Sequence, residues 1–293
     1  MIRTILAILV LLFFVGCESK PARPMVVSTN LWIGYSPLYY AEQKGWLRES
    51  NIKLVRTVSL GESLQIFKNG SADMLCGTKY EISKVYENET NKGSVIPLDR
   101  SNGGDYVLGN RSIEELKLEK KIDVYLEVES VNAVLLDFFI KKHALSYSQI
   151  NMIDSSPVVN AKLRMKRNAT IIVTYDPYNI KLQKQGYMVL GSTKEKELLV
   201  IDAIYAPQRT KIEFPREMQT LNFLIFKSLK VLRDNPKEYF EKINNYYAYS
   251  NFKEFEDALE SIEWIYSDRT VVIKKREETS NGKHPTLIKA YEE

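Results

Sequence analysis

The sequence has 293 residues, of which 44% are apolar and 27% are charged, a composition typical of globular proteins. Its 41 basic and 37 acidic residues give a formal net charge of +4, and no basic run is longer than Lys274–Arg276. This near-balance excludes a nucleic-acid-binding signature, which requires basic residues gathered on one face. The chain is long enough to bury one large core or two smaller ones.

The N-terminal residues predict an export signal, residues 1–16, that is not part of the fold. The apolar run Ile5–Val15 has eleven residues, too few to cross the roughly 30 Å hydrocarbon core of a bilayer as a helix. The segment Phe-Val-Gly-Cys17 resembles the lipobox of bacterial lipoproteins, although phenylalanine stands where leucine is usual. This resemblance implies that Cys17 is lipidated and that residues 17–24 form a lipidated tether. The alternative is an ordinary secreted protein with a stray cysteine.

Cysteine and histidine are too sparse for most catalytic or metal-binding arrangements. Cys76, the only cysteine after Cys17, lies in an apolar segment and is expected to be a small buried hydrophobe. His143 and His284 are far apart, without the spacing of metal ligands. We therefore expect no metal site, no histidine-based catalytic triad and no cofactor, and the core must be held together by packing.

From Val26 onwards, the pattern alternates between β-branched segments and short helices. Ser36 is expected to cap a helix that starts at Pro37, where a missing N–H costs nothing. Gly45 ends this helix and Gly70 ends a later one. Strands are predicted at Val26–Ile33, Asn51–Val58, Asp73–Gly77 and Val95–Leu98, and further helices at Glu62–Asn69 and Lys79–Asn88.

The middle of the chain repeats this alternation. Ser130 is expected to cap a helix that runs to about His143 with an apolar stripe along one face. Strands alternating with helices of this length indicate βαβ units and sheets covered on both faces. Strands are predicted at Lys121–Leu126, Ile150–Ile153, Thr170–Thr174 and Leu198–Ala206, and helices at Val158–Arg167 and after Tyr175.

The C-terminal part is predicted to be helical. The strands are expected to stop at Phe214, and the final stretch 270–293 is highly charged, with no structure predicted for it. The pattern as a whole predicts an α/β body with a helical C-terminal part. The expected C-terminal helices are Pro215–Asp234, Pro236–Tyr247 and Phe252–Ser267.

Five segments between Val26 and Thr210 carry a family resemblance when they are taken in order. They are IGYSPLYYAEQKGWLRESNIKLV, ESLQIFKNGSADMLCGTKYE, PLDRSNGGDYVL, VESVNAVLLDFFIKKHALSYSQINMI and IIVTYDPYNIKLQKQGYMVL. Together they resemble the periplasmic solute-binding proteins of ABC importers, specifically the branch that binds nitrate, taurine, alkanesulfonates and the pyrimidine precursor of thiamine. Each segment alone is weakly specific.

The resemblance implies a type II periplasmic-binding-protein fold, with two α/β lobes on mixed sheets and the ligand in the cleft between them. Residues 25–105 and 206–293 would form lobe 1 and residues 106–205 lobe 2, with crossing strands near Asp105–Gly109 and Ala203–Pro207. The implied partners are a small-molecule ligand and an ABC permease in the membrane, and no nucleic acid. The protein would be a lipid-anchored monomer of the cell envelope, periplasmic or on the outer face of the cytoplasmic membrane.

In open α/β sheets, ligands bind beyond the carboxyl ends of strands, where helix starts offer unpaired N–H donors and a partial positive charge. In the candidate site, Gly34 allows close backbone approach, Tyr35 offers a ring and Ser36 a hydroxyl; the alternative is a plain capping motif. Lys79 would neutralise an anionic ligand, or it is a solvated lysine. The candidates in lobe 1 are Gly34, Tyr35, Ser36, Gly61, Glu62, Thr78 and Lys79.

Further candidates lie near the first crossing and in lobe 2. Asn102 and Asp105 belong to a glycine-containing segment that could bend as a hinge, with an ordinary tight turn as the alternative. Glu129 and Tyr175 stand where the family commonly has glycine and tryptophan, which allows a different ligand. Because Asp105, Glu129 and Asp176 are acidic, a neutral or amine-bearing heterocycle is favoured over a sulfonate or nitrate. These candidates are Ser101, Asn102, Asp105, Glu129, Ser130, Tyr175 and Asp176.

Three functions are compatible with these features. The first is a binding protein that delivers its ligand to an ABC permease, which the export signal and the resemblance favour. The second is a ligand-sensing lipoprotein that serves a membrane receptor. The third is an enzyme on the same scaffold, similar to pyrimidine-precursor synthases, which the export signal and the position of Cys76 within a strand disfavour. The chain is therefore predicted not to be an enzyme.

Overall fold

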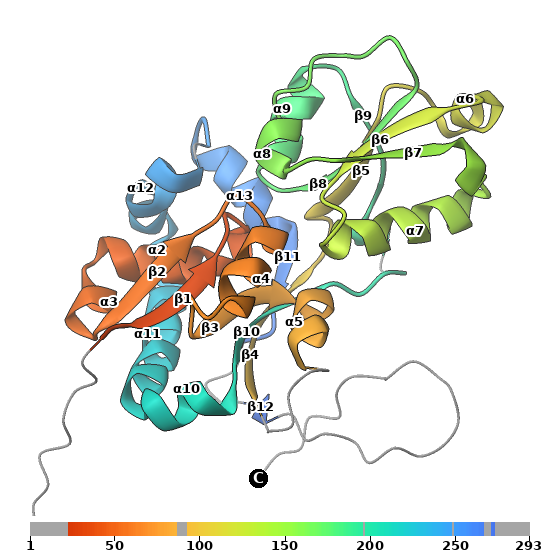
Figure 1. The fold of residues 1–293 in the computed structure, drawn as a ribbon. Helices are drawn as coiled ribbons and strands as arrows, with labels where there is room; N and C mark the ends of the chain where they lie inside the picture. The colour runs from red at the N-terminus through yellow and green to blue at the C-terminus, as the bar shows by residue number, and fades with distance from the viewer. Residues whose placement is uncertain (1–22, 87–92, 196, 248, 267–270, 273–293) are drawn as a thin grey trace, which may run out of the picture.

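The computed structural model describes residues 23–86, 93–195, 197–247, 249–266 and 271–272. The predicted signal, Cys17 and most of the predicted tether lie outside the described residues. Figure 1 shows two α/β halves, one above the other, each built on its own sheet. No helix in the described part of the chain is both long enough and apolar enough to span a bilayer.

The first sheet is mixed. Its strands are β1 (Met25–Thr29), β2 (Ile52–Arg56), β3 (Met74–Thr78), β4 (Ser94–Ser101), β10 (Ile201–Ala206), β11 (Ile262–Trp264) and β12 (Val271–Val272). They lie in the order β11-β4-β10-β3-β1-β2, with β12 paired to β4. β1 runs parallel to β2 and β3, whereas β10 lies antiparallel between β3 and β4.

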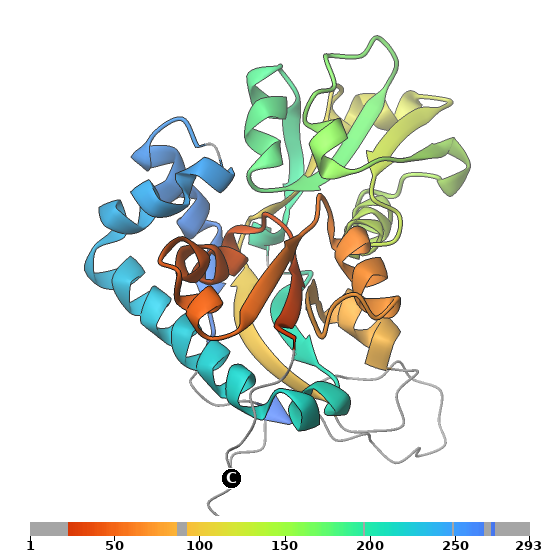
Figure 2. The ribbon, with the colours of Figure 1, turned by 60° about the vertical axis from the view of Figure 1, so that its left-hand side comes forward.

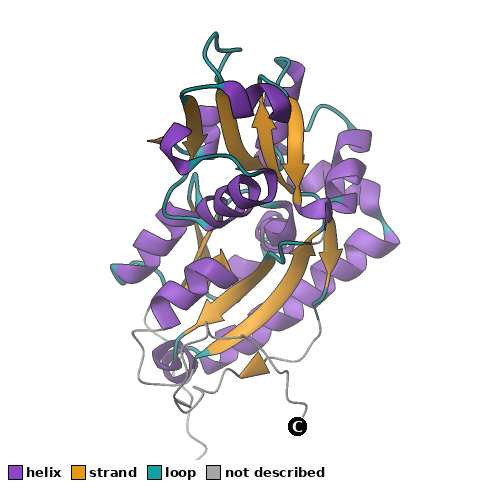
Figure 3. Cartoon of the chain, turned by 90° about the vertical axis from the view of Figure 1, so that its right-hand side faces the viewer, coloured by secondary structure: helices purple, strands orange, loops and turns teal. Residues whose placement is uncertain are grey.

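The second sheet is also mixed. Its strands are β5 (Asp105–Gly109), β6 (Ile122–Leu126), β7 (Ile150–Asp154), β8 (Thr170–Tyr175) and β9 (Met188–Ser192), in the order β7-β6-β8-β5-β9. β6 runs parallel to β7 and β8, and β5 lies antiparallel between β8 and β9. Figure 3 shows the strands of the two sheets gathered in separate halves of the molecule.

Helices cover both faces of each sheet. The α-helices are α2 (Ser36–Gln43), α3 (Trp46–Glu49), α4 (Leu60–Lys68), α5 (Lys79–Tyr86), α6 (Ile113–Leu118), α7 (Val131–His143), α8 (Pro157–Asn160), α9 (Tyr178–Lys184), α10 (Gln208–Glu213), α11 (Pro215–Asp234), α12 (Pro236–Tyr247) and α13 (Phe252–Glu260). Short 3-10 turns are η1 (Ile33–Tyr35), η2 (Tyr147–Gln149) and η3 (Thr193–Glu195). Figure 2 shows α4 and α5 on one face of the first sheet and α2 and α11 on the other.

Alternating strand residues build separate cores on the two faces of each sheet. In β3, Leu75 packs with side chains of α4 and α5, while Cys76 joins the larger cluster that includes α2 and α11. In β8, Ile171 and Ile172 divide in the same way between a cluster with α7 and one with α9. Cys76 is therefore a small buried hydrophobe, as predicted.

The predicted α/β architecture with two mixed sheets is confirmed. α11 and α12 have the predicted bounds, and each begins at a proline, whose fixed φ suits the first turn. Ser130 caps α7 as predicted, because its Oγ accepts a hydrogen bond from the N–H of Asn132 at 3.2 Å. Gly45 and Gly70 follow their helices with φ of 77° and 79°.

Other predicted boundaries are wrong. Ser36 does not cap a helix, because the turn η1 continues directly into α2 and places Ser36 in helical conformation. The predicted helix Val158–Arg167 is limited to α8, because residues 164–168 are exposed and have no apolar face to bury. The strands do not stop at Phe214, since β11 pairs with β4. The pattern also misses β9.

The expected crossing strands lie within the sheets. Asp105–Gly109 is strand β5 of the second sheet, and Ala203–Pro207 overlaps β10 of the first. β4 of the first sheet ends at Ser101 and β5 of the second begins at Asp105, whereas β9 of the second sheet ends at Ser192 and β10 of the first begins at Ile201. The division into two lobes remains a prediction. β10 pairs with β3 and β4 and therefore belongs to the first sheet.

Candidate functional site

Polar side chains at strand ends of both sheets meet between the two halves of the molecule. Asn30 follows β1 and Thr78 ends β3, whereas Tyr175 ends β8 and Asp105 opens β5. They enclose a cavity of about 10 Å³, the space of roughly one water molecule. The cavity is lined by Asn30, Trp32, Leu60, Thr78, Asp105, Tyr175 and Asp202.

Asn30 and Tyr175 join the two halves directly. The Nδ2 of Asn30 donates a hydrogen bond to the hydroxyl of Tyr175 at 2.8 Å, and both side chains are buried. The ring centroids of Trp32 and Tyr175 lie 6.0 Å apart at an interplanar angle of 80°, an edge-to-face contact. These contacts hold two walls of the cavity, one from each half, against each other.

Each half also sends a glutamate to a helix start of the other half. Glu127, after β6, accepts a hydrogen bond from the N–H of Gly61 in the first turn of α4 at 2.8 Å. Glu81 of α5 accepts one from the N–H of Val131, the first residue of α7, also at 2.8 Å. A second comes to Glu81 from the N–H of Thr78 at 2.9 Å. The protein's own carboxylates therefore meet the unpaired N–H groups of both helix starts.

Three aspartates lie buried around the cavity. The indole Nε1 of Trp32 donates to Oδ1 of Asp99 at 3.1 Å, and the hydroxyl of Tyr35 donates to Oδ1 of Asp202 at 2.7 Å. Burial raises the pKa of Asp99 and Asp202 well above its usual range, and the neighbouring negative charges raise it further. Burial raises the pKa of Asp105 to about 6. Oδ2 of Asp99 and Oδ2 of Asp105 have no hydrogen-bond partner in the described part of the protein.

The predicted residues of the turn before α2 lie behind the cavity wall. A Cβ at Gly34 would be 1.8 Å from Oδ2 of Asp99, so glycine is needed there for close approach to a protein side chain. Tyr35 and Ser36 are fully buried in the core. The Oγ of Ser36 accepts a hydrogen bond from the hydroxyl of Tyr239 at 3.1 Å, which ties this turn to α12.

The other predicted residues of the first half divide between the cavity and the surface. Thr78 lines the cavity, and Gly61 holds the opposing glutamate through its N–H. Glu62 is exposed and accepts a hydrogen bond from the N–H of Val58 at 2.7 Å, which helps to cap α4. Lys79 is exposed as well. Glu62 and Lys79 therefore lie outside the cavity lining.

Asp105 and Tyr175 line the cavity, and Asp176 is buried next to them. The backbone N–H of Asp176 donates to the carbonyl of Gly104 at 2.9 Å. Burial raises the pKa of its carboxyl group to about 7, and its Oδ1 has no partner among the residues that the structure describes. Asp176 is thus another buried carboxylate at the junction of the two halves.

The remaining predicted residues surround the junction. Ser101 is buried where β4 ends, and Asn102 is partly buried beside it. Ser130 caps α7 and is buried. Glu129 is exposed at the rim, where it forms an ion pair of 3.2 Å with Lys84 of the other half.

Sequence reasoning missed several residues of this site. Asp99 follows the apolar residues of one strand segment, in PLDRS, and Asp202 interrupts another, in VIDAI. An acidic residue in such a segment is buried only at a cost, which is a signal of a functional site. The missed residues are Asn30, Trp32, Leu60, Glu81, Asp99, Glu127 and Asp202.

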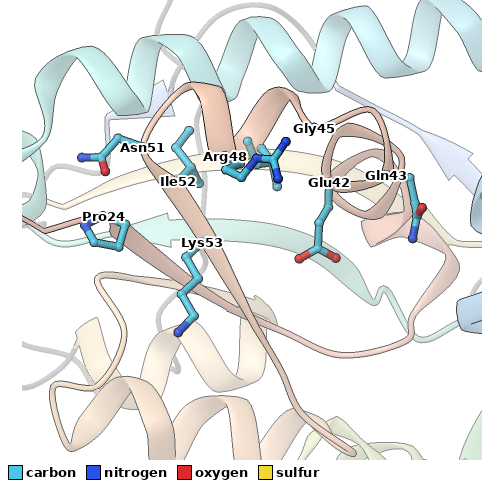
Figure 4. Close-up of a pocket in the computed structure, with 9 residues that line it drawn as sticks. Pro24, Glu42, Gln43, Gly45, Arg48, Asn51, Ile52 and Lys53 are labelled. Atoms are coloured by element: carbon cyan, nitrogen blue, oxygen red, sulfur yellow. The ribbon is translucent and has the colours of Figure 1, made fainter.

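A larger hollow of about 580 Å³ lies on the outer surface of the first half (Figure 4). Its lining includes the exposed side chains of Gln43, Arg48 and Lys53. Its carboxylate, that of Glu42, is already paired with Arg56 at 3.1 Å. The full lining is Pro24, Glu42, Gln43, Gly45, Leu47, Arg48, Asn51, Ile52 and Lys53. Because the buried unpaired carboxylates lie elsewhere, we assign no binding role to this hollow.

Gly61→Ala is expected to displace the Glu127 side chain and so to remove one of the contacts that hold the two halves together. A Cβ at this position would lie 2.6 Å from Oε1 of Glu127 in the other half. The variant should lose this hydrogen bond to a charged group, about 1.5–3 kcal/mol, and show a larger radius of gyration by small-angle X-ray scattering. In the control Gly191→Ala, the new Cβ would meet Phe139 at 3.4 Å, and the radius should not change. An unchanged radius in Gly61→Ala would contradict this role for the contact.

Comparison with known proteins bears on the fold. No protein-family model and no curated protein sequence matches the chain. The alkanesulfonate-binding protein SsuA of Xanthomonas axonopodis pv. citri, bound to MOPS, is 15% identical with a TM-score of 0.66, over 84% of this chain and 88% of its own. SsuA of Escherichia coli is 12% identical with a TM-score of 0.64, over 87% of each chain. The nitrate-binding protein NrtA of Synechocystis PCC 6803 is 12% identical with a TM-score of 0.61, over 80% of this chain and 70% of its own.

The chain therefore has the fold of the periplasmic binding proteins, as the sequence resemblance implied. Several of the structures that it matches are named as binding proteins, among them the alkanesulfonate-binding and nitrate-binding proteins above. The buried polar groups of this chain lie between the two sheets of that fold.

Proposed function

We propose that this protein is an extracytoplasmic solute-binding lipoprotein that captures a small polar metabolite between two lobes and delivers it to the permease of an ABC importer. The observation that carries the proposal is the junction cavity, where buried polar side chains from strand ends of both sheets meet. Two halves, each built on its own sheet, can part and close around a ligand at such a junction. The fold shared with SsuA and NrtA and the predicted export signal support the same assignment.

The two lobes of this proposal correspond to the two sheets. Lobe 1 takes residues 25–105 and 206–293, and lobe 2 takes residues 106–205, except that β10 goes with lobe 1 because it pairs with β3 and β4. Lipidation of Cys17 would hold the protein, as a monomer, at the membrane in which the permease lies.

Two alternatives remain. A ligand-sensing lipoprotein would use the same cavity and would differ only in its membrane partner. An enzyme on this scaffold would need a reactive group at the junction. Cys76 does not provide one, because it is fully buried in β3 and burial raises the pKa of its thiol.

The proposal is tested by mass spectrometry of the small molecules released when the purified protein is denatured. We expect at least one metabolite in near-stoichiometric amount, which raises the melting temperature when it is added back; a ligand at 100 times its Kd stabilises by about 2.7 kcal/mol. Failure of every released or added metabolite to change the melting temperature would refute the proposal. Uptake of the identified metabolite by cells with and without the protein separates transport from sensing.

A further inference from the structure

Two helix starts at the junction, those of α4 and α7, are already occupied by the protein's own carboxylates. The N–H of Gly61 donates to Glu127, and the N–H of Val131 donates to Glu81, each across the junction at 2.8 Å. A sulfonate or nitrate at either helix start would have to displace a carboxylate, and would leave that carboxylate close to a second negative charge. Recognition of an anion through these helix starts is therefore disfavoured.

The cavity itself presents hydrogen-bond acceptors with unsatisfied capacity. Asp105 lines it with a side chain only 4% exposed, and Oδ2 of Asp105 has no partner in the described ranges. Asp99 lies behind this lining: its Oδ1 accepts from the cavity residue Trp32, and its Oδ2 faces Gly34. Asp202 adds a second carboxylate to the lining, and no described lining residue is basic. A buried carboxylate without a full set of partners favours a ligand that brings both donors and positive charge.

Aromatic rings complete the walls. Trp32 and Tyr175 line the cavity, and the ring of Tyr178 lies 5.4 Å from that of Tyr175 at 76°. The face of an aromatic ring attracts a cation, especially where water is excluded. The unpartnered carboxylate oxygen of Asp105 and the aromatic lining therefore both favour a positively charged group.

We propose that the ligand is a small organic cation, whose protonated amine or amidinium group enters the cavity and donates hydrogen bonds to Asp105 beside Asp202. This inference rests on the function proposed above and names its ligand class. A cavity of about 10 Å³ accepts a single small group, so the body of the ligand requires the two halves to part. A metal cation is not favoured, because no group of three His, Cys, Asp or Glu side chains in the described residues is arranged to hold one.

The test uses the full-length protein and a bacterial metabolite extract divided into cationic, neutral and anionic pools at pH 7.5. Each pool is incubated with the protein, unbound compounds are removed, and bound compounds are identified by mass spectrometry. We expect enrichment from the cationic pool alone. Asp105→Asn, which removes the charge with little change in shape, should lower this enrichment at least tenfold. The control Glu256→Gln removes an exposed carboxylate of α13 and should bind as the unaltered protein does.

The outcomes separate the ligand class from the function. Enrichment from the anionic or neutral pool would overturn the ligand class while the binding function stands. Enrichment from no pool would overturn the binding function and the ligand class with it. If Asp105→Asn and the unaltered protein enrich a cation equally, the proposal that the cation binds at the carboxylate of Asp105 would be overturned. Melting curves establish that the variants fold. If Asp105→Asn does not fold, Asp202→Asn replaces it, because Asp202 is the other carboxylate of the cavity lining; the same tenfold loss is expected.

Discussion

The ligand-free protein is expected to lose roughly 3 kcal/mol or more of stability as the pH rises from 5 to 8. Burial raises the pKa of Asp105 to about 6 and that of Asp176 to about 7, whereas an aspartate in an unfolded chain titrates near 3.9. A group whose pKa is higher in the folded state contributes stability that is complete below its unfolded pKa and is lost as the pH rises through its folded pKa. The loss should therefore begin near pH 4 and be largely complete by about pH 8.

Four other buried carboxyl groups have pKa values raised by burial and therefore add to the loss as the pH rises: Asp99, Asp202, Glu81 and Glu127. Groups with lowered pKa values act in a different pH window or weakly. Asp137 and Glu254 have lowered pKa values because of ion pairs and hydrogen bonds, so their contribution is lost only as the pH falls below about 4. The pKa of His143 is lowered by partial burial and opposes the trend, but this side chain is partly exposed and its effect is small. Urea unfolding at pH 5, 6, 7 and 8, followed by circular dichroism, measures the profile. Stability that is constant or rises over this range would show that the junction carboxylates are not desolvated.

Asp105→Asn is expected to flatten this profile and to stabilise the ligand-free protein at pH 8, because it removes a buried charge that lacks a full set of partners. A carboxylate that is fully paired should behave in the opposite way. Asp73 accepts hydrogen bonds from the guanidinium of Arg23 at 2.7 and 2.8 Å and from the N–H of Val26 at 2.8 Å. Asp73→Asn should therefore cost about 1–3 kcal/mol. A destabilised Asp105→Asn at pH 8 would indicate a structural role for Asp105 in place of a binding role.

Tyr239→Ala is expected to lose about 3–5 kcal/mol of stability. The ring of Tyr239 is fully buried between α12 and α2, stacked on Tyr40 with centroids 4.6 Å apart and an interplanar angle of 3°. It also lies 6.2 Å from the ring of Phe255 of α13. Removing the ring leaves a cavity between α12, α13 and α2. Chemical denaturation measures the loss as a shift of the midpoint.

Tyr239→Phe is the matched control for this prediction. It keeps the ring and removes only the hydrogen bond from the hydroxyl to Ser36 at 3.1 Å, which is worth about 1 kcal/mol. Ser36 directly follows the turn η1. Comparing the two variants therefore separates the stability that comes from packing of the Tyr239 ring from the stability that comes from its hydrogen bond to Ser36. Equal losses in the two variants would contradict the packing explanation.

Elements with their own start signals could be predicted from local sequence. Pro215 and Pro236 mark the starts of α11 and α12, and Ser130 marks the start of α7. β11 has no comparable signal, because a three-residue segment with glutamate in its middle becomes a strand only where β4 offers an edge for pairing. β9 is likewise an edge strand, and its partly exposed residues show no apolar alternation.

The sequence by itself determined the α/β class, the buried position of Cys76 and the presence of polar residues after several strands, because periodicity and turn chemistry act over a few neighbouring positions. Only the tertiary structure decided which polar residues meet. Gly61 and Glu127 are 66 positions apart, and Asn30 and Tyr175 are 145 apart, yet each pair shares a hydrogen bond of 2.8 Å. Such contacts depend on how the two sheets approach each other, and no local propensity specifies that approach.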